Sequence, residues 1–292
     1  MKQTLYMTLI CLAFLNGCRP KADTGSLDFH VGYRVNGQEL ATDTLRYVNE
    51  AGNPFMITEI QWFLSHLEIQ DSQGQWTAIG EEVRYFDTGI PASHSISIED
   101  IPLGTYQALR FTFGLDEADN RTGRFPNPPE ANMFWPEPLG GGYHYMKLNG
   151  RWLNTNLELQ PFNIHLGVGQ NTGLTEFYPN HFTVTLPIDL TIKKSQENSI
   201  SLTMVIDNWF RGPNLYDFNH YGSAIMQNQE AQQALRENGH DVFEAHAETS
   251  FVEDLARPIS KITKAAAPQP HFFTLEHMGK LWSDLTHKNK KP

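Results

Sequence analysis

The sequence predicts a mainly β protein, an antiparallel β-sandwich with one or two short helices toward the C-terminus. The clearest evidence is a period of two between Phe182 and Ile192, where every even-numbered residue is apolar and most odd-numbered residues are polar. Successive side chains of a strand point to opposite faces, so this alternation is typical of a strand with one buried face. The pattern returns from Ile200 to Ile206, and polar turns separate further runs of the same kind.

Turn-forming residues divide the rest of the chain into short apolar runs. Further strands are expected at Leu27–Val35, Ile57–Ile69, Val83–Phe86, Ser95–Ile98, Tyr106–Phe113, His144–Trp152 and Phe162–Leu166. The expected turns are Asn36-Gly37, Gly52-Asn53-Pro54, Gln73-Gly74 and Asn149-Gly150. Pro187 cannot donate to a strand ladder, which predicts an edge position or a bulge in its strand. Residues 193–198 are polar and are expected to form a hairpin loop.

The composition changes toward the C-terminus. Residues 227–238 are rich in Gln, Ala and Glu, which favour helix, and Gly239 is suited to cap that helix. Residues 265–270 are typical of a linker, and a short amphipathic helix is expected around 275–285. The predicted organisation is a β-sandwich domain over residues 27–257 followed by a linker and tail over 258–292.

The first residues have the pattern of an export signal. Lys2 precedes an apolar run from Leu5 to Leu15, which is too short to span a bilayer and matches a signal-peptide core. The run ends in Leu15-Asn16-Gly17-Cys18, which resembles a lipobox, the motif whose cysteine receives lipid. We therefore expect a signal peptide over 1–17, lipidation of Cys18 and a tether over 18–26. Ordinary secretory cleavage near Gly17 is the alternative.

Charge and cysteine content narrow the function further. The formal net charge is −11 at pH 7, which argues against binding nucleic acid through phosphates. Cys11 leaves with the signal peptide, so the mature chain has no disulfide. No sequence motif of a hydrolase, metalloprotease, nucleotide-binding loop or cysteine nucleophile is present, so we do not expect an enzyme. The expected location is extracytoplasmic, anchored by lipid to a bacterial membrane, most simply the outer membrane facing the periplasm.

Several motifs follow one another in a characteristic order. They are Ile60–Ile69, Val83–Asp87, Ile101–Tyr106, Phe111–Asp116, Met133–Trp135, Gly142–Gly150, His165–Gly167 and Ile206–Asp207. This ordered set resembles the MbnP-like copper-binding domain, which occurs in periplasmic partners of methanobactin systems and in many lipoproteins. The resemblance covers roughly residues 27–245. It implies a β-sandwich fold, a location outside the cytoplasm and copper binding.

The residues at the family's ligand positions differ in this chain. The copper-binding members carry one histidine where this chain has Ser65 and a second where it has Arg121. His66 follows Ser65 directly, but one step along a strand reverses the face of a side chain. His66 therefore cannot simply replace the family ligand, and Arg121 would repel a cation.

Other histidines lie in the segments that carry the resemblance. His165 and His144 are expected to matter more than His66 for copper, and Met146 follows His144 at strand spacing as a soft donor for Cu(I). Hydrogen-bonded structural histidines are the alternative for both. The acidic segment Asp116–Asn120 offers oxygen ligands for calcium, with a capped polar turn as the alternative.

Two functions follow from these observations. The first is a metal-handling lipoprotein, with copper as the expected metal and a dihaem peroxidase-like protein or a copper transporter as the expected partner. The second is a non-metal accessory lipoprotein that supports a neighbouring haem protein, transporter or surface complex. The substituted positions Ser65 and Arg121 are the sequence feature that separates them.

Overall fold

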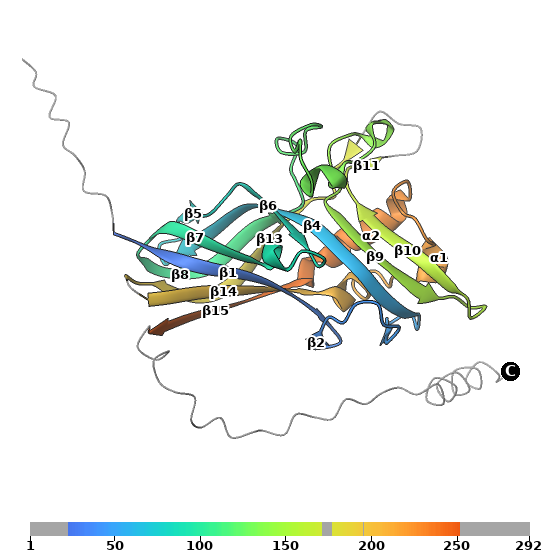
Figure 1. Ribbon diagram of the computed structural model, residues 1–292, viewed down its shortest axis with the longest axis horizontal. Coiled ribbons are helices and arrows are strands. Elements are labelled where there is room, and N and C mark those ends of the chain that lie inside the picture. Colours follow the sequence, from blue (N-terminus) through green and yellow to red (C-terminus); the bar gives the residue numbers. More distant parts are fainter. Residues whose placement is uncertain (1–22, 171–176, 195, 252–292) are drawn as a thin grey trace, which may run out of the picture.

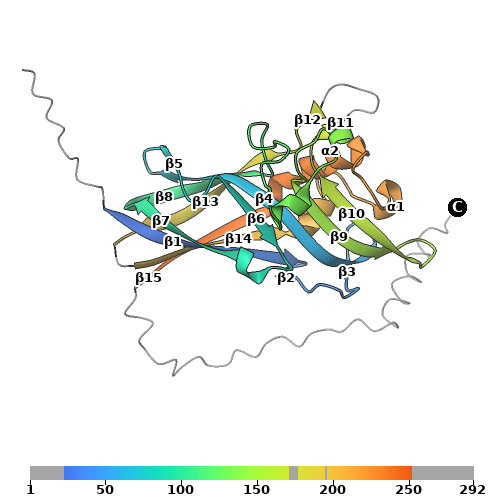
Figure 2. The same cartoon turned by 45° about the horizontal axis from the view of Figure 1, so that its top comes forward.

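Two β-sheets pack against each other in the computed structural model, which describes residues 23–170, 177–194 and 196–251 (Figure 1). The predicted mainly β sandwich is confirmed. The smaller sheet has the strand order β15-β14-β1-β2, with β7 also paired to β1. The larger sheet has the order β10-β9-β4-β8-β13, with β3, β5 and β6 paired to β4. Figure 2 shows the two sheets from a second direction, with the helices gathered at one end.

The elements have the following bounds. The strands are β1 (Thr24–Val35), β2 (Gln38–Glu39), β3 (Tyr47–Val48), β4 (Pro54–Asp71), β5 (Trp76–Ala78), β6 (Val83–Asp87), β7 (Ser95–Pro102), β8 (Gly104–Phe113), β9 (Met146–Leu153), β10 (Leu159–Leu166), β11 (Gly169–Gln170), β12 (Phe177–Tyr178), β13 (Phe182–Ile192), β14 (Gln196–Val205) and β15 (Phe243–Phe251). The α-helices are α1 (Phe218–Tyr221) and α2 (Gln229–Asn238), and short 3₁₀ helices are η1 (Pro91–His94), η2 (Glu130–Met133), η3 (Glu137–Leu139), η4 (Ile206–Phe210) and η5 (Gly239–Asp241). In the described part of the chain, no helix is long and apolar enough to cross a membrane.

The strand with the clearest alternation forms as predicted. β13 spans Phe182–Ile192 and pairs with β8 at the edge of the larger sheet. Its register shifts between Pro187 and Leu190, so the proline sits at both an edge and an irregularity. Helix α2 also lies where the composition predicted a helix, capped by the side chain of Asn228 at its start and by Gly239 at its end.

Two predictions about strand connections were wrong. Residues 193–198 do not form a hairpin, because β13 belongs to the larger sheet and β14 to the smaller one. The connection instead crosses between the sheets, and β14 already begins at Gln196. The sandwich is also not purely antiparallel, since β14 runs parallel to β1 in the register Asp28↔Ser199 to Arg34↔Val205. Alternation reports which face of a strand is buried and carries no information about its direction.

The Asn149-Gly150 pair lies inside β9 and does not form a turn. A Cβ atom at Gly150 would stand 2.2 Å from the Met56 carbonyl oxygen and 2.3 Å from the Phe162 ring. Glycine is therefore required here because the neighbouring strands β4 and β10 approach too closely for a side chain. In the sequence alone, a glycine after an asparagine looks the same whether it forms a turn or allows such a close approach.

An aromatic core joins the two sheets. The Trp62 ring on β4 lies 5.0 Å from Phe86 and 5.3 Å from Phe243, measured between ring centroids. Its indole Nε1 donates a hydrogen bond of 3.0 Å to the Tyr33 hydroxyl on β1. Trp62 is fully buried. Burial of large aromatic side chains contributes much of the hydrophobic stabilisation of such a core.

The β-sandwich begins earlier in the chain than expected. β1 begins at Thr24, three residues inside the expected tether, and the last described strand ends at Phe251. The expected signal peptide (1–17), Cys18, the linker (265–270) and the short helix around 275–285 lie outside the described residues.

A long connection separates β8 from β9. This β8–β9 loop, residues 114–145, carries the short helices η2 and η3 and is held by hydrogen bonds within itself. Asn120 Oδ1 accepts from the Tyr143 backbone N–H at 2.8 Å, and Thr122 Oγ1 accepts from the Gly142 backbone N–H at 2.9 Å. Long ordered loops on a rigid sheet are common places for functional residues.

Candidate metal centre

A β-bulge on β4 positions His66. The register of β4 against β8 shifts between Ser65 and Glu68, and His66 has a φ of 53°, in the left-handed region. Its backbone N–H donates to the Glu82 carbonyl at 2.9 Å. The bulge interrupts the alternation of faces, so the His66 side chain is partly exposed while its neighbours Leu64 and Leu67 are buried.

Two aspartates of the β8–β9 loop face this histidine, each anchored through one carboxylate oxygen. Asp116 Oδ1 accepts hydrogen bonds of 2.9 Å from the backbone N–H groups of Ala118 and Asp119. Asp119 Oδ1 is bound by the guanidinium of Arg124, which also donates to Glu82 at 3.0 Å. The Asp119 side chain is only 3% exposed. In each carboxylate the second oxygen, Oδ2, is left to face His66.

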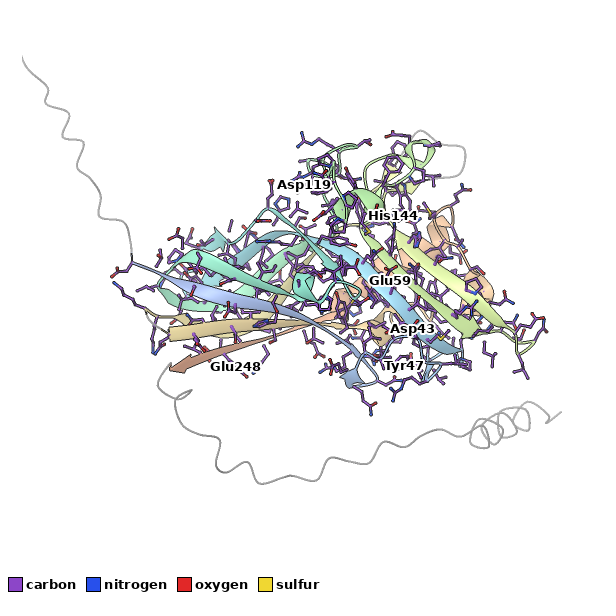
Figure 3. All side chains as sticks on the ribbon, viewed as in Figure 1. Asp43, Tyr47, Glu59, Asp119, His144 and Glu248 are labelled. Carbon is purple, nitrogen blue, oxygen red and sulfur yellow. The ribbon has the colours of Figure 1, made fainter. Side chains whose placement is uncertain are left out.

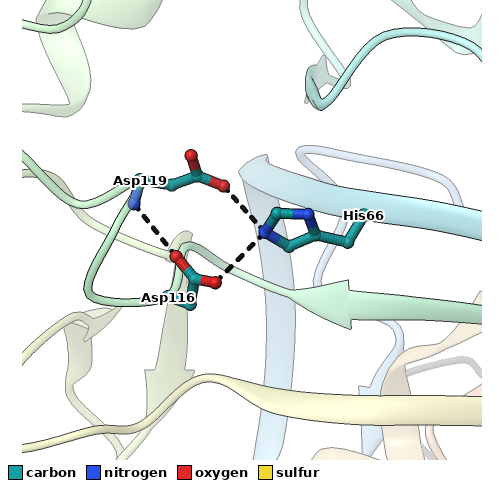
Figure 4. Close-up of side chains that lie close together, drawn as sticks. All are labelled: His66, Asp116 and Asp119. Atoms are coloured by element: carbon teal, nitrogen blue, oxygen red, sulfur yellow. Dashed lines mark hydrogen bonds and ion pairs between the residues drawn. The ribbon is translucent and has the colours of Figure 1, made fainter.

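The three side chains converge on one small region (Figure 4). His66 Nε2 lies 3.2 Å from Asp116 Oδ2 and 2.9 Å from Asp119 Oδ2. All three ligand atoms lie within 4.8 Å of one another. His66 Nε2 and Asp119 Oδ2 are buried atoms without a hydrogen-bond partner, so their close contact lacks hydrogen-bond geometry. Ligands bound to one transition ion at about 2.1 Å with right angles lie about 3 Å apart, which matches this spacing.

The electrostatic surroundings of Asp116 keep its carboxylate charged. Burial raises the pKa of Asp116, but the backbone N–H of Asp119 and the nearby imidazole of His66 outweigh it, so the pKa is lowered overall. A carboxylate that stays ionised is available to bind a cation at neutral pH. Arg124 partly offsets the two negative charges from the far side of Asp119.

The two other predicted ligands, His144 and His165, lie together in a second place. Their ring centroids are 4.9 Å apart at an interplanar angle of 87°. His144 is the penultimate residue of the β8–β9 loop and precedes β9, whereas it had been expected on that strand. His165 lies on β10 opposite Lys147 of β9. Figure 3 labels His144 together with Asp119, and both belong to the β8–β9 loop.

Met146 does not join this pair. It is fully buried in the hydrophobic core and lies opposite Leu166 in the β9–β10 register. His165 is the residue before Leu166 and therefore faces the other side of the sheet, where the ring of His144 contacts it. The sulfur of Met146, the expected soft donor, is thus directed into the core. The prediction assumed that His144 and Met146 lie on one strand and share a face, but His144 precedes the strand.

Both imidazoles of the pair are kept neutral. Burial lowers the pKa of His144 to about 3, and burial together with the charge of Lys147 lowers the pKa of His165 to about 4. A neutral imidazole retains one lone pair, which is the form that binds metals.

Comparison with known proteins identifies the family of this chain. A model of the MbnP family matches residues 24–228, which is well over half of the chain. The chain belongs to the MbnP family. A solved structure titled "MbnP from Methylosinus trichosporium" has a similar fold, with a TM-score of 0.50 at 12% sequence identity, and the match covers 77% of this chain and 99% of that one. No curated protein matches the sequence closely enough to add a further relative.

The positions aligned with the copper ligands of MbnP-like domains do not take part in the cluster. Ser65 is fully buried and its hydroxyl donates to the Gly114 carbonyl at 2.9 Å, so it has a structural role. Arg121 is exposed. His66, next to Ser65, and Asp119, two residues before Arg121, supply two of the three converging atoms in this MbnP-family chain, and Asp116 supplies the third.

The acidic segment contributes two side chains, Asp116 and Asp119, to the candidate cluster. Asn120 Oδ1 is occupied by the Tyr143 N–H, and Glu117 is exposed and lies 3.5 Å from His181. The imidazole of His66 completes the cluster, and calcium binds oxygen ligands, not imidazole. Sequence reasoning singled out both Asp116 and His66 but had no signal that joined them, because a bulge and the pairing of β4 with β8 bring them together.

Proposed function

We propose that this MbnP-family protein is a lipid-anchored, extracytoplasmic copper-binding protein that holds Cu(II) between His66, Asp116 and Asp119. The observation that carries the proposal is the convergence of one imidazole nitrogen and two carboxylate oxygens, with each carboxylate anchored through its other oxygen. Supporting hydrogen bonds of this kind orient metal ligands and are a common feature of metal sites.

The donor set favours a divalent ion. Imidazole suits copper and zinc, whereas carboxylates are hard ligands that do not select Cu(I). Two carboxylates also supply two negative charges against the two positive charges of the ion. The resemblance to MbnP-like copper-binding domains favours copper over zinc. Three protein ligands leave coordination positions for water or a partner's side chain, which suits an ion that is carried and passed on.

The location and partner follow from the N-terminal sequence and the family. The apolar run and the quartet ending in Cys18 support export and lipidation, most simply at the outer membrane facing the periplasm. A dihaem peroxidase-like protein or a copper transporter at that membrane would exchange copper with the open site.

The test uses the mature protein purified in detergent. After exposure to Cu(II) and desalting, elemental analysis is expected to give one copper per chain at the cluster. Electron paramagnetic resonance is expected to show hyperfine splitting from a single imidazole nitrogen. Both signals should be lost in His66→Ala and in Asp116→Asn.

A matched control is His246→Ala. His246 is an exposed histidine on β15, with 76% of its side chain accessible and Glu248 3.3 Å away. This variant should retain copper fully. Retention of copper in His66→Ala, or a wild type that keeps no copper, would contradict the proposal. In that case the contact of His66 with the two aspartates is structural, and the accessory-lipoprotein function takes its place.

A further inference from the structure

The ring of His144 is held with one nitrogen free. The Met133 carbonyl oxygen accepts the His144 backbone N–H at 2.6 Å and lies 2.9 Å from His144 Nδ1. Because a carbonyl can only accept, Nδ1 carries the ring proton. Nε2 of this neutral ring therefore keeps its lone pair, and it is a buried atom without a hydrogen-bond partner. Buried polar atoms are rarely left unpaired, so this nitrogen calls for an explanation.

The ring of His165 is also held by one hydrogen bond, but through Nε2 and not through Nδ1 as in His144. His165 Nε2 lies 3.0 Å from Asn149 Oδ1. The orientation of that amide is fixed because Asn149 Nδ2 donates to Glu59 at 3.3 Å. The amide oxygen accepts, so the proton of His165 is on Nε2 and the lone pair is on Nδ1. The chain from Glu59 through Asn149 to His165 matches the carboxylate-supported histidines of metal sites.

The separation of the two rings fits a shared ion. An imidazole bonded at about 2.0 Å places its ring centre roughly 3 Å from the ion, so two such rings lie roughly 4.5 to 6.5 Å apart. The observed separation of 4.9 Å falls within that range. Trp135 closes another side of His144, with its ring centroid 4.7 Å away.

The surroundings limit the kind of ion. Among the described residues, His144 and His165 belong to no group of three or more potential His, Cys, Asp or Glu ligands. Zinc requires four ligands and calcium six or more, whereas Cu(I) is stable with two or three. Lys147 lies close enough to lower the pKa of both rings, and Glu59 partly balances its charge. A site with two neutral donors beside a lysine favours a monovalent ion.

We propose that His144 Nε2 and His165 Nδ1 form a second metal site, separate from the His66 cluster, that binds monovalent copper. Silver(I) shares this charge and softness and does not change its oxidation state, so it serves as a probe. The inference does not rest on the Cu(II) site, because the two sites share no ligand.

The test is a titration of the mature protein in detergent with Ag(I), and with Cu(I) under anaerobic conditions against a competing chelator. His144→Gln and His165→Gln are expected to weaken binding by more than about a hundredfold, because loss of a supporting partner alone costs about 10- to 100-fold. Asn149→Ala removes only such a partner and should weaken binding about tenfold. Lys147→Gln removes the opposing charge and should tighten binding.

Two further measurements make the result decisive. His66→Ala should leave Cu(I) affinity unchanged, so failure of the Cu(II) site and failure of this site give different patterns. X-ray absorption of wild-type protein carrying Cu(I) should show two nitrogen neighbours, independently of whether a variant folds. Unchanged affinity in folded His144→Gln and His165→Gln, or a spectrum with sulfur or four or more neighbours, would overturn the assignment.

Discussion

The buried carboxylate of Asp119 combines two roles that its neighbour Asp116 does not share. Asp119 is 3% exposed, is ion-paired to Arg124 through one oxygen and contacts His66 with the other. Asp116 is 31% exposed and is bound mainly by backbone N–H groups. Removing one partner of a buried ion pair leaves an uncompensated charge, which is costly, whereas the loss of an exposed charge costs little.

This difference in burial predicts that Asp119→Asn and Asp116→Asn differ in stability, although both should lose copper. Asp119→Asn should abolish Cu(II) retention and lower the free energy of unfolding by about 2 kcal/mol or more, since Arg124 loses its buried partner. Asp116→Asn should also abolish retention but lower the free energy of unfolding by no more than about 1 kcal/mol. Urea denaturation of the metal-free proteins measures both values. Equal destabilisation by the two changes would contradict this account.

The neutral state of His144 predicts a dependence of stability on pH. Its pKa is lowered to about 3 in the folded protein by burial, against 6.5 for an ordinary histidine. Above pH 6.5 the group is neutral in both states. As the pH falls below 6.5 the unfolded chain binds the proton first, so stability is lost progressively until about pH 3. Between pH 6.5 and pH 5 this group alone should cost about 2 kcal/mol.

His144→Gln should remove that contribution while keeping an N–H donor for the Met133 carbonyl. The free energy of unfolding, measured by urea denaturation at several pH values, should then fall less steeply between pH 6.5 and pH 5. A variant with the same slope as wild type would show that His144 is not the titrating group. His246→Gln, at an exposed position, is the control and should leave the slope unchanged.

At the residue scale, the sequence singled out the histidines that meet in the structure but not the way they are grouped. His144 and His165 were expected in one site with Met146, and they do meet, while Met146 faces the core. His66 was expected to matter least, because strict alternation would have turned it away from the ligand face. The positive φ at His66 and the register shift beside it change that direction. A local bulge of one residue leaves no mark in the hydrophobic pattern.

At the scale of elements, the glycine within β9 illustrates how close the strands pack. Gly150→Ala would place a methyl group 2.2 Å from a backbone carbonyl, which cannot move without shifting β4. We expect the free energy of unfolding to fall by about 3 kcal/mol, at the upper end of the cost of overpacking. Thermal unfolding followed by circular dichroism measures the effect as a lower melting temperature.

The matched control is Gly32→Ala on β1. A Cβ there would meet only the Thr203 hydroxyl at 3.8 Å, which is ordinary contact. This change should be neutral or stabilise by up to about 1 kcal/mol, because alanine restricts the unfolded chain more than glycine does. A comparable loss of stability in both variants would show that steric crowding is not the reason for Gly150.

The existence and extent of strands followed from the sequence better than their connections did. β13 forms over the predicted residues, because eleven residues of alternating polarity specify one buried face. The path from β13 to β14 could not be predicted in the same way, because a polar segment after a strand suits a hairpin and a crossing between sheets equally. The parallel pairing of β1 with β14 depends on contacts between residues more than 170 positions apart.

At the scale of the whole molecule, the fold and the candidate metal sites depend on different parts of the chain. The two sheets are joined by buried aromatic side chains such as Trp62, and this core maintains the sandwich. Both candidate sites draw ligands from the β8–β9 loop, which supplies Asp116, Asp119 and His144. Ligands on a loop can change without altering the core. This separation is consistent with a chain that keeps the fold of the solved MbnP at 12% identity.

The remaining prediction concerns a lipid anchor that would hold the whole molecule at a membrane. Cys18 ends the lipobox-like quartet, and β1 begins at Thr24, so residues 19–23 can span at most about 18 Å between a lipid anchor and the sandwich. A lipid anchor should therefore keep the domain close to the membrane surface. One acyl chain binds only marginally, whereas the several chains of a bacterial lipoprotein anchor stably.

Changing Cys18 to serine should release the protein from the membrane fraction into the soluble periplasmic fraction, because the thiol that receives the lipid is gone. Cell fractionation with immunoblotting measures the location, and mass spectrometry of the wild type should show the added mass of acyl chains. Cys11→Ser is the matched control, since it changes the only other cysteine, which lies inside the expected signal peptide. That variant should remain in the membrane fraction. A wild-type protein that is already soluble and lacks acyl mass would instead indicate ordinary secretory cleavage near Gly17 and a sandwich free to diffuse.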